Sequence, residues 1–258
     1  MLDDAALPAP PPRPPDVSDD FRKGPDPSLW VPGYLAHWTT PDRAAARYDA
    51  GVDGLRLRID EDQLDWRPED APLRVSNLQT GSFSGPVGSP RGTHRHRPDG
   101  LVVRTPQPTR LLWAPRRGRI DLTVSASGDD GCMLAAWLVG TEHESPNDSG
   151  EICVFEIDAP RPGGAWTART GIKAHGDDRL RAEMSEIPLG FDPRLPHTWT
   201  VLWGDGHTTV GCEGRVVFHT AQAPDYPLFL MLDLFEIGSR GGRYPKTAAI
   251  HGMRGWEV

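Results

Sequence analysis

From about residue 20 to its end, the sequence is a series of short runs rich in β-branched and aromatic residues, each broken by Gly, Pro, Asn or Asp. Roughly a dozen such runs with turn residues between them are typical of a β-sandwich or jelly roll. Helical periodicity covers two turns at most, at 41–48. We therefore predict an all-β fold. The expected strands span 54–59, 73–78, 101–104, 110–114, 119–126, 132–140, 151–157, 171–175, 198–203, 207–212, 215–220, 228–234 and 252–258.

The segment 198–218 contains the clearest turn signals. Gly204-Asp205-Gly206 separates the run 198–203 from 207–212, and Glu213-Gly214 separates that run from 215–218. Tight turns of this kind join antiparallel neighbours, so we predict a three-stranded meander. No period of 20 to 50 residues repeats, which disfavours propellers and solenoids.

The length of 258 residues fits one large all-β domain with its own core. Residues 1–19 include the proline-rich stretch 8–15 and few large apolar side chains, so we expect a disordered tail. One domain is expected to follow over 20–258. The first residues contain no basic segment followed by an apolar stretch, so no secretory signal is visible and the localisation stays open.

Composition excludes several partners. Lys+Arg 28 against Asp+Glu 36 gives a net charge of -8, which is unfavourable for a surface that follows phosphates, so nucleic acid is not an expected partner. No apolar window approaches the roughly 18 residues of a membrane span, so no membrane partner is expected. Three cysteines without CxxC spacing fit reduced thiols. Searches for GxSxG, Walker and HExxH motifs find none.

Two glutamates, Glu151 and Glu156, lie in an apolar run that is expected to be a strand. On a regular strand they would point to opposite faces, because side chains alternate with a period of two. A one-residue bulge near Val154 and Phe155 would bring both to one face. Two carboxylates about 5 Å apart are what a retaining glycosidase needs. The alternative is that both are solvent-facing acids on an exposed sheet face.

The chain resembles glycoside hydrolase family 16 in four segments that follow the family's order along the chain: 133–137, 151–156, 195–203 and 227–234. The family motif E-[IL]-D-x-x-E matches 151–156, with Cys153 in place of the aspartate. The run 133–137 stands where the family has W-P-A-x-W, with Met133 replacing the first tryptophan. The segments 195–203 and 227–234 resemble the family's FHTYAIEW and P-x-x-L-I-L-N-L strands. The resemblance spans about 25–258 and implies a concanavalin A-like β-sandwich jelly roll, as in laminarinases, lichenases and agarases.

The resemblance also implies catalytic roles. Glu151 matches the family's nucleophile and Glu156 its acid/base, in a reaction that retains anomeric configuration. Cys153 stands where the family has an aspartate that sets the charge and orientation of the pair, and a neutral thiol supplies neither in the same way. Cys153 is therefore a candidate site residue, although buried cysteines also simply fill cores.

Candidate substrate-binding residues are of two kinds. Aromatic rings stack on the apolar faces of sugars, and the aromatic candidates are Trp137, Trp38, Trp113 and Phe235. Trp137 is favoured because its strand directly precedes that of Glu151. Three polar residues are expected to reach the cleft and bind sugar hydroxyl groups. These are His96, His175 and Asp233.

No metal or cofactor is expected. His94 and His96 would share one face of a strand, but no carboxylate or cysteine stands nearby at ligand spacing. Family 16 members often carry a structural calcium, and no acidic cluster here is diagnostic of one.

The sequence therefore predicts a monomeric retaining endo-type glycoside hydrolase, or a transglycosylase, acting on a β-linked polysaccharide such as a β-1,3-glucan. Its expected partner is the carbohydrate substrate alone. A catalytically weak or inactive lectin-like domain that binds glycans in the same cleft is the alternative. A third interpretation is an enzyme acting on a glycosylated small molecule.

Overall fold

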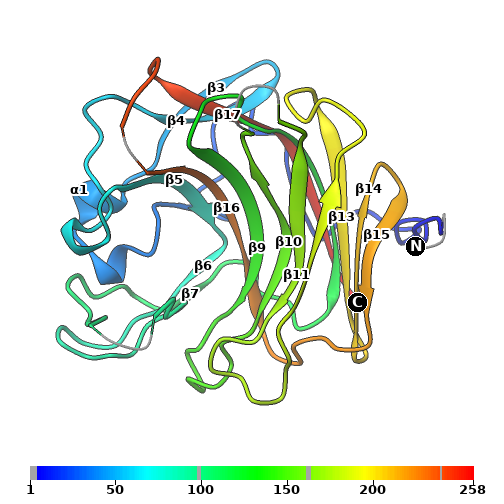
Figure 1. The fold of residues 1–258 in the computed structure, drawn as a ribbon. Coiled ribbons are helices and arrows are strands. Elements are labelled where there is room, and N and C mark those ends of the chain that lie inside the picture. The colour runs from blue at the N-terminus through cyan, green and yellow to red at the C-terminus, as the bar shows by residue number, and fades with distance from the viewer. Residues whose placement is uncertain (1–4, 98–99, 161–163, 239) are drawn as a thin grey trace.

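The computed structural model describes residues 5–97, 100–160, 164–238 and 240–258, which form two large antiparallel sheets (Figure 1). One sheet contains β1 (Val17–Asp19), β3 (Arg47–Gly51), β4 (Gly54–Ile59), β8 (Gly118–Ser125), β13 (His197–Gly204), β14 (His207–Cys212), β15 (Arg215–Thr220) and β17 (Lys246–Glu257). The other contains β2 (Val31–Pro32), β5 (Leu73–Gln79), β9 (Cys132–Gly140), β10 (Glu151–Asp158), β11 (Thr167–Lys173), β12 (Glu183–Pro188) and β16 (Leu228–Ile237). A small third sheet pairs β6 (Gly81–Ser82) with β7 (Arg110–Leu111).

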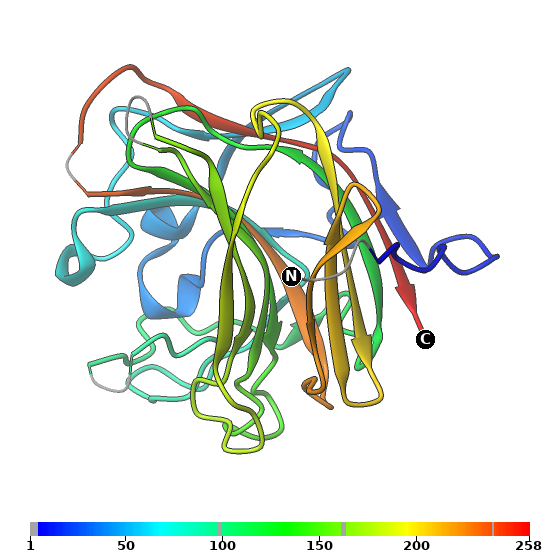
Figure 2. The ribbon, with the colours of Figure 1, turned by 45° about the vertical axis from the view of Figure 1, so that its right-hand side comes forward.

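The strand order defines the sandwich. The first sheet runs β15-β14-β13-β8-β17-β4-β3, with β1 added beside β17, and the second runs β12-β11-β10-β9-β16-β5-β2. The second sheet is curved, and α1 (Pro41–Ala44), β6 and β7 lie on its concave side (Figures 1 and 2). This arrangement confirms the predicted all-β sandwich.

The main core lies between the two sheets and follows strand alternation. Alternate residues of β9 and β16, from Leu134 to Leu138 and from Leu228 to Leu234, point into it. The opposite sheet supplies Leu57, Trp199 and Ile250, all essentially without exposed surface. Each large side chain buried in this way contributes about 1.5–3 kcal/mol, so this layer dominates the stability of the fold.

A second apolar cluster covers part of the concave face. Alternate residues of β9 and β16 that point away from the main core, among them Trp137 and Phe229, contact side chains of Leu35, Trp38 and Trp66. The loops before and after β5 therefore close over the sheet. The part of the concave face near β10 and β11 lies beside this cluster and carries several polar side chains.

Most strand predictions are confirmed, and the differences have physical causes. The run 101–104 is not a strand, because Leu101 and Val103 pack singly into the cluster on the concave face. The strands β3 and β12 were missed, because both lie at sheet edges with largely exposed side chains and few apolar residues.

The helices of the described ranges are short. The predicted helix at 41–48 is reduced to α1, followed directly by β3, and two 3-10 turns, η1 (Ala36–Trp38) and η2 (Pro68–Asp70), accompany it. No helix in these ranges has the length and apolar character needed to cross a membrane.

The expectation of a disordered tail over 1–19 is wrong for residues 5–19, and residues 1–4 lie outside the described part. β1 pairs with β17, and the Leu7 amide donates to the Gly214 carbonyl. Trp256 Nε1 donates to the Arg13 carbonyl at 3.1 Å. The tail is ordered by these contacts with the edge strand and the C-terminal strand, so it needs little apolar surface of its own.

The predicted meander β13-β14-β15 is confirmed by its register. Its two turns require a left-handed backbone: φ is 48° at Asp205 and 76° at Gly206, then 50° at Glu213 and 77° at Gly214. These pairs match the conformation that twisted two-residue hairpins demand, for which Asp-Gly is a favoured sequence.

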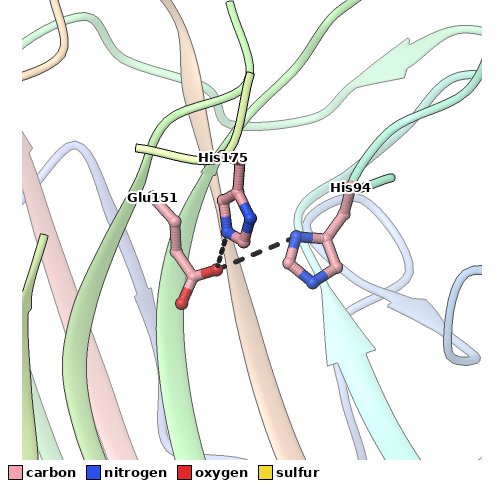
Figure 3. Close-up of side chains that lie close together, drawn as sticks. All are labelled: His94, Glu151 and His175. Atoms are coloured by element: carbon pink, nitrogen blue, oxygen red, sulfur yellow. Dashed lines mark hydrogen bonds and ion pairs between the residues drawn. The ribbon is translucent and has the colours of Figure 1, made fainter. Parts of the chain in front are cut away.

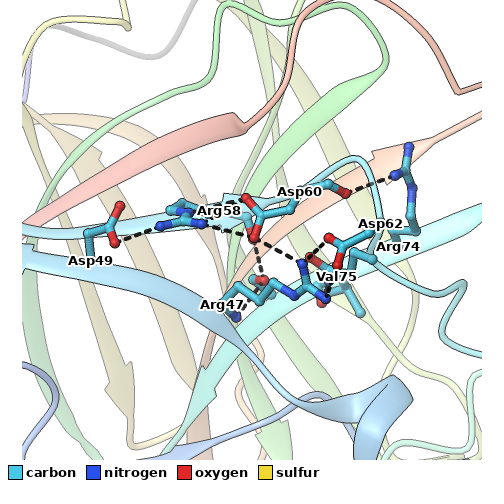
Figure 4. Close-up of polar contacts among 9 residues, drawn as sticks. Arg47, Asp49, Arg58, Asp60, Asp62, Arg74 and Val75 are labelled. Carbon is cyan, nitrogen blue, oxygen red and sulfur yellow. Dashed lines mark hydrogen bonds and ion pairs between the residues drawn. The ribbon is translucent and has the colours of Figure 1, made fainter.

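Polar contacts tie the two sheets together at the edge formed by β3, β4 and β5 (Figure 4). Arg58 binds both Asp49 and Asp60, and Arg74 donates to the Asp60 carbonyl at 3.2 Å. Arg74 also forms an ion pair with Glu236, and both side chains are almost fully buried, at 2% and 3% exposure. A buried ion pair of this kind is costly to break from one side only.

We expect Arg74→Met to lower the free energy of unfolding by about 3 kcal/mol, because it leaves the Glu236 carboxylate buried without its cation. Combining Arg74→Met with Glu236→Leu removes both charges and should recover most of that loss. Urea unfolding followed by tryptophan fluorescence measures both. Arg194→Met is the control, because Arg194 is 59% exposed and pairs with Asp192 at the surface, so its effect should stay below about 1 kcal/mol. A double variant as unstable as the single variant would contradict this account.

Candidate active site

The site is built on an irregularity in β10. Cys153 pairs with Trp137 and Phe155 pairs with Ala136, so Val154 has no partner on β9. Both Val154 and Phe155 consequently point into the main core. The bulge predicted at these two positions is therefore present, and it places Glu151, Cys153 and Glu156 on the concave face. A carboxylate oxygen of each glutamate and the Cys153 sulfur lie within 4.8 Å of one another.

Lys173 on the neighbouring strand β11 binds both glutamates. It pairs with Glu151 in the strand register, and its Nζ lies 2.9 Å from Glu151 Oε1 and 2.5 Å from Glu156 Oε1. Burial opposes the charge of Lys173, but the two carboxylates outweigh it and hold its pKa above the ordinary value. Sequence reasoning missed this residue, although the expected strand 171–175 contained it.

Glu151 is completely buried and contacts two histidines (Figure 3). His175 Nε2 donates to Oε2 at 2.8 Å, and His94 Nδ1 lies 3.8 Å from the same oxygen. Burial by itself raises the pKa of Glu151, but the His175 hydrogen bond and the charge of Lys173 outweigh it and lower that pKa to about 2. Burial lowers the pKa of His94 to about 3, so this ring is neutral.

Glu156 is also nearly buried and has every carboxylate oxygen bonded. Trp137 Nε1 donates to Oε1 at 3.1 Å, beside the Lys173 contact. Arg169 Nε donates to Oε2 at 2.9 Å. Both glutamates are therefore held by cationic or N–H groups of the strands on either side of β10.

Cys153 lies between the glutamates and carries no charge. Its side chain is buried, and its thiol donates to the Arg169 carbonyl at 3.6 Å. Burial, with Glu156 nearby, raises the pKa of the thiol well above its ordinary value. In place of a third carboxylate, the pair thus has a neutral thiol beneath it and the Lys173 ammonium beside it.

Asp233 on β16 lies level with Glu156 in the strand register of the same sheet. It pairs with Ala135, which in turn pairs with Glu156. Asn77 Nδ2 donates to Asp233 Oδ1 at 2.7 Å, while Oδ2 is buried without a partner. Burial raises the pKa of Asp233 well above its ordinary value, and the Asn77 hydrogen bond opposes this only in part. Burial thus favours the neutral form of Asp233, which lies two strands away from Glu156.

The four aromatic candidates lie in different parts of the fold. Trp137 and Phe235 lie on the concave face, with ring centroids 5.5 Å apart. Trp113 was predicted wrongly, because it lies in the main core between the sheets, against Gly255. The prediction for Trp38 is also wrong, since this side chain is fully buried in the cover and its Nε1 donates to the Thr93 carbonyl.

A pocket of about 620 Å³ lies beside His94 and His175. Residues of the segments 90–97, 142–149 and 175–176 line it. They include His96 and His175, but not Glu151 or Glu156. His94 also lines it, and its ring stacks on Trp137 with centroids 5.8 Å apart. His94 and His175 both contact Glu151 and line the pocket, so these two rings lie between the pocket and Glu151.

Three pocket residues adopt a left-handed backbone that is unusual for non-glycine residues. φ is 54° at His94, 54° at Glu142 and 49° at His175. Glu142, which sequence reasoning missed, accepts a hydrogen bond from the His94 amide at 2.6 Å. Burial raises the pKa of Glu142 to about 8, against the opposing effect of that hydrogen bond. Such backbone conformations cluster at functional sites, where surrounding contacts hold them in place.

No protein-family model and no curated protein matches the sequence, whereas solved structures match nearly all of it. The GlcNAcα1-4Gal releasing endo-β-galactosidase from Clostridium perfringens is 23% identical with a TM-score of 0.82, over 96% of this chain and 65% of that chain. SCLam, a non-specific endo-β-1,3(4)-glucanase from family GH16, is 15% identical with a TM-score of 0.68, over 98% of each chain. The Crh5 transglycosylase is 14% identical with a TM-score of 0.60, over 94% of this chain and 84% of that chain.

These likenesses confirm the predicted concanavalin A-like jelly-roll fold of the family 16 type. The chain spans just under two thirds of the length of the galactosidase.

We expect Asp233→Asn to become more stable relative to the unmodified protein as pH rises. The folded pKa of Asp233 lies above its unfolded value, so its stabilisation is complete below the unfolded pKa and is lost as pH rises toward the folded one. Asparagine has no such loss, and the difference should shift by at least about 1 kcal/mol between pH 5 and pH 9. Urea unfolding at both pH values measures it. The control is Asp62→Asn, because Arg47 lowers the pKa of this surface carboxyl and its effect should not change over that range. Equal shifts in both variants would show that Asp233 is ionised in the folded protein.

Proposed function

We propose that this protein is a retaining glycoside hydrolase or transglycosylase that acts on a β-linked polysaccharide such as a β-1,3-glucan. The observation that carries this proposal is the bulge in β10, which brings carboxylate oxygens of Glu151 and Glu156 to within 4.8 Å. Retaining enzymes need carboxyl groups about 5–5.5 Å apart, so that one attacks while the other exchanges a proton. Structural neighbours that are described as a β-galactosidase, a β-glucanase and a transglycosylase support the same reaction class.

In the proposed reaction Glu151 attacks the anomeric carbon while Glu156 donates a proton to the leaving oxygen. Glu156 then takes a proton from water, or from a second sugar hydroxyl in a transglycosylase, and that oxygen displaces Glu151. Glu151 is suited to the first role because the His175 bond and Lys173 keep it ionised. Trp137, whose indole binds Glu156, fixes the orientation of the second carboxylate.

Glu156 must gain a proton before it can act as an acid. In the structure Lys173 and Arg169 occupy its two oxygens. The Lys173 side chain is 28% exposed and has a flexible stem, so its ammonium has room to move off Glu156 while it keeps its contact with Glu151. We assign Lys173 to this exchange, with His96 and His175 as the hydroxyl-binding residues of the pocket. Asp233 and Phe235 are buried and do not line the pocket, so the proposed reaction does not use them as substrate contacts.

A lectin-like glycan-binding domain is the second candidate function, and one observation favours it. Both carboxylates are buried and bonded to cations, so neither is free to contact a sugar in this structure. A protein that only binds glycans in the pocket has no need to change this state.

Glu151→Gln is expected to reduce turnover at least 1,000-fold while leaving glycan binding within a few fold, because the amide keeps the shape but is not a nucleophile. Release of reducing ends from a panel of β-linked polysaccharides measures turnover, and calorimetry with the same glycans measures binding. Glu257→Gln, at an exposed position in the last strand, is the matched control and should match the unmodified protein. Binding without any turnover by the unmodified protein would favour the lectin. Proton NMR of the first product tests retention, and an inverted anomer would overturn the assigned roles.

Cys153→Asp is expected to raise the turnover rate, by about tenfold. A carboxylate at this position would lie beside both glutamates and compete for Lys173, which would weaken the Lys173–Glu156 contact and favour proton donation by Glu156. The comparison of kcat for the two proteins on one substrate measures this, and Cys153→Ser controls for the loss of the thiol alone. A slower Cys153→Asp enzyme would show that the thiol and Lys173 together form the working arrangement.

A further inference from the structure

Three donor atoms from separate segments converge above β10: His94 Nδ1, Glu151 Oε2 and His175 Nε2 (Figure 3). His175 Nε2 lies 2.8 Å and His94 Nδ1 3.8 Å from the same carboxylate oxygen. The contact to His175 is a hydrogen bond, whereas 3.8 Å is too long for one. Two imidazoles therefore face one oxygen, and only one of them bonds to it.

The spacing suits a small tetrahedral cation. With bonds of about 2.0–2.1 Å, the donor atoms of a tetrahedral zinc site lie about 3.3 Å apart. The two separations in this cluster lie on either side of that value, and all three atoms are within 4.8 Å of one another. Small side-chain adjustments would equalise them.

The backbone holds both histidines in place independently of Glu151. The His94 amide donates to Glu142, and the His94 ring stacks on Trp137. The Gly176 amide, next to His175, donates to Ser149 Oγ at 3.1 Å. Both histidines have positive φ, a conformation that costs energy in a non-glycine residue and persists only when contacts enforce it.

We propose that His94, Glu151 and His175 bind one transition-metal cation of the Zn²⁺ class. Two imidazoles and one carboxylate are the donor set of such cations, whereas Ca²⁺ and Mg²⁺ require mainly oxygen donors. The pocket, which both histidines line, offers an entry path and room for a water as fourth ligand. Lys173 stays on the other oxygen of Glu151 and on Glu156, so the cation and the ammonium bind different atoms.

Occupation of this site would silence the enzyme. A cation on Glu151 Oε2 withdraws the electron pair that attacks the anomeric carbon, and it stands where the pocket meets the glutamates. This consequence rests on the proposed function, whereas the binding itself does not. The site is thus a place where a divalent cation and the substrate compete.

Calorimetric titration of the EDTA-treated full chain with ZnCl₂ tests the binding directly. We expect one cation per chain, and at least tenfold weaker binding in His175→Ala and in Glu151→Gln. Replacement of Zn²⁺ by Co²⁺ should produce the visible absorption of a four-coordinate site. His96→Ala is the matched control, because His96 lies on the same segment as His94 and lines the same pocket but is outside the cluster. The Zn²⁺ affinity of this variant should stay within twofold of that of the unmodified protein.

Several outcomes would overturn the proposal. Unchanged Zn²⁺ affinity in His175→Ala and Glu151→Gln would do so, as would Ca²⁺ binding as tight as that of Zn²⁺. Loss of binding in His219→Ala alone would place the cation at the surface pair His207 and His219, whose rings stack 5.7 Å apart. Thermal melts of each variant show that the chain remains folded, and the half-exposed position of His175 makes its replacement the safer one.

Activity separates this proposal from the proposed function. Glycan cleavage that Zn²⁺ inhibits and EDTA restores supports both. Site-dependent Zn²⁺ binding by a chain that cleaves no glycan leaves the metal site standing and removes the hydrolase. Cleavage by a chain that binds no Zn²⁺ removes the metal site alone, and cleavage unaffected by bound Zn²⁺ removes the inhibition.

Discussion

The contact of Lys173 with Glu151 and Glu156 is the interaction on which the concave face depends. Moving a carboxylate out of water costs several kcal/mol, and this cost is offset only when a charge or good hydrogen bonds replace the solvent. Here the bulge in β10 buries two carboxylates on one face, within reach of each other. One ammonium bonded to both makes that burial tolerable, and Arg169 and His175 supply the remaining bonds.

The sequence was sufficient to predict what depends on the chain's local pattern. Strand alternation around Glu151 showed that Glu156 needs a bulge, and the register places that bulge at Val154. The meander of β13 to β15 followed from its turn residues. Strands with exposed, polar edges, such as β12, left no such pattern, and the proline-rich tail is ordered by partners elsewhere in the chain rather than by its own composition.

The rest of the site could not be predicted, because it arises from contacts between distant segments. Lys173 matters only because β11 pairs with β10 in a register that sets it opposite Glu151. His94 and Glu142 reach the site from two loops whose paths have no signature in the sequence. Tryptophans are equally ambiguous: Trp137 and Trp113 both lie in apolar runs, and only the direction of the side chain decides which one is near the glutamates.

The charge balance around the two glutamates depends on the neutral thiol of Cys153. The carboxyl groups of Glu151, Glu156 and Asp158, set against Lys173 and Arg169, leave a formal charge of about one negative unit at the site. His94 and the Cys153 thiol add no charge. Such a site has two ways to lower its energy further: it can accept a proton, which prepares Glu156 for acid catalysis, or it can accept a cation, which the imidazoles beside Glu151 are placed to ligate. In the proposed reaction, movement of Lys173 off Glu156 favours the first route, because it leaves that carboxylate without its ammonium. An empty pocket favours the second, since nothing then separates His94 and His175 from a cation in solvent. In the proposed function, the same negative charge links glycan binding to proton uptake, and the proposed cation on Glu151 competes with the substrate.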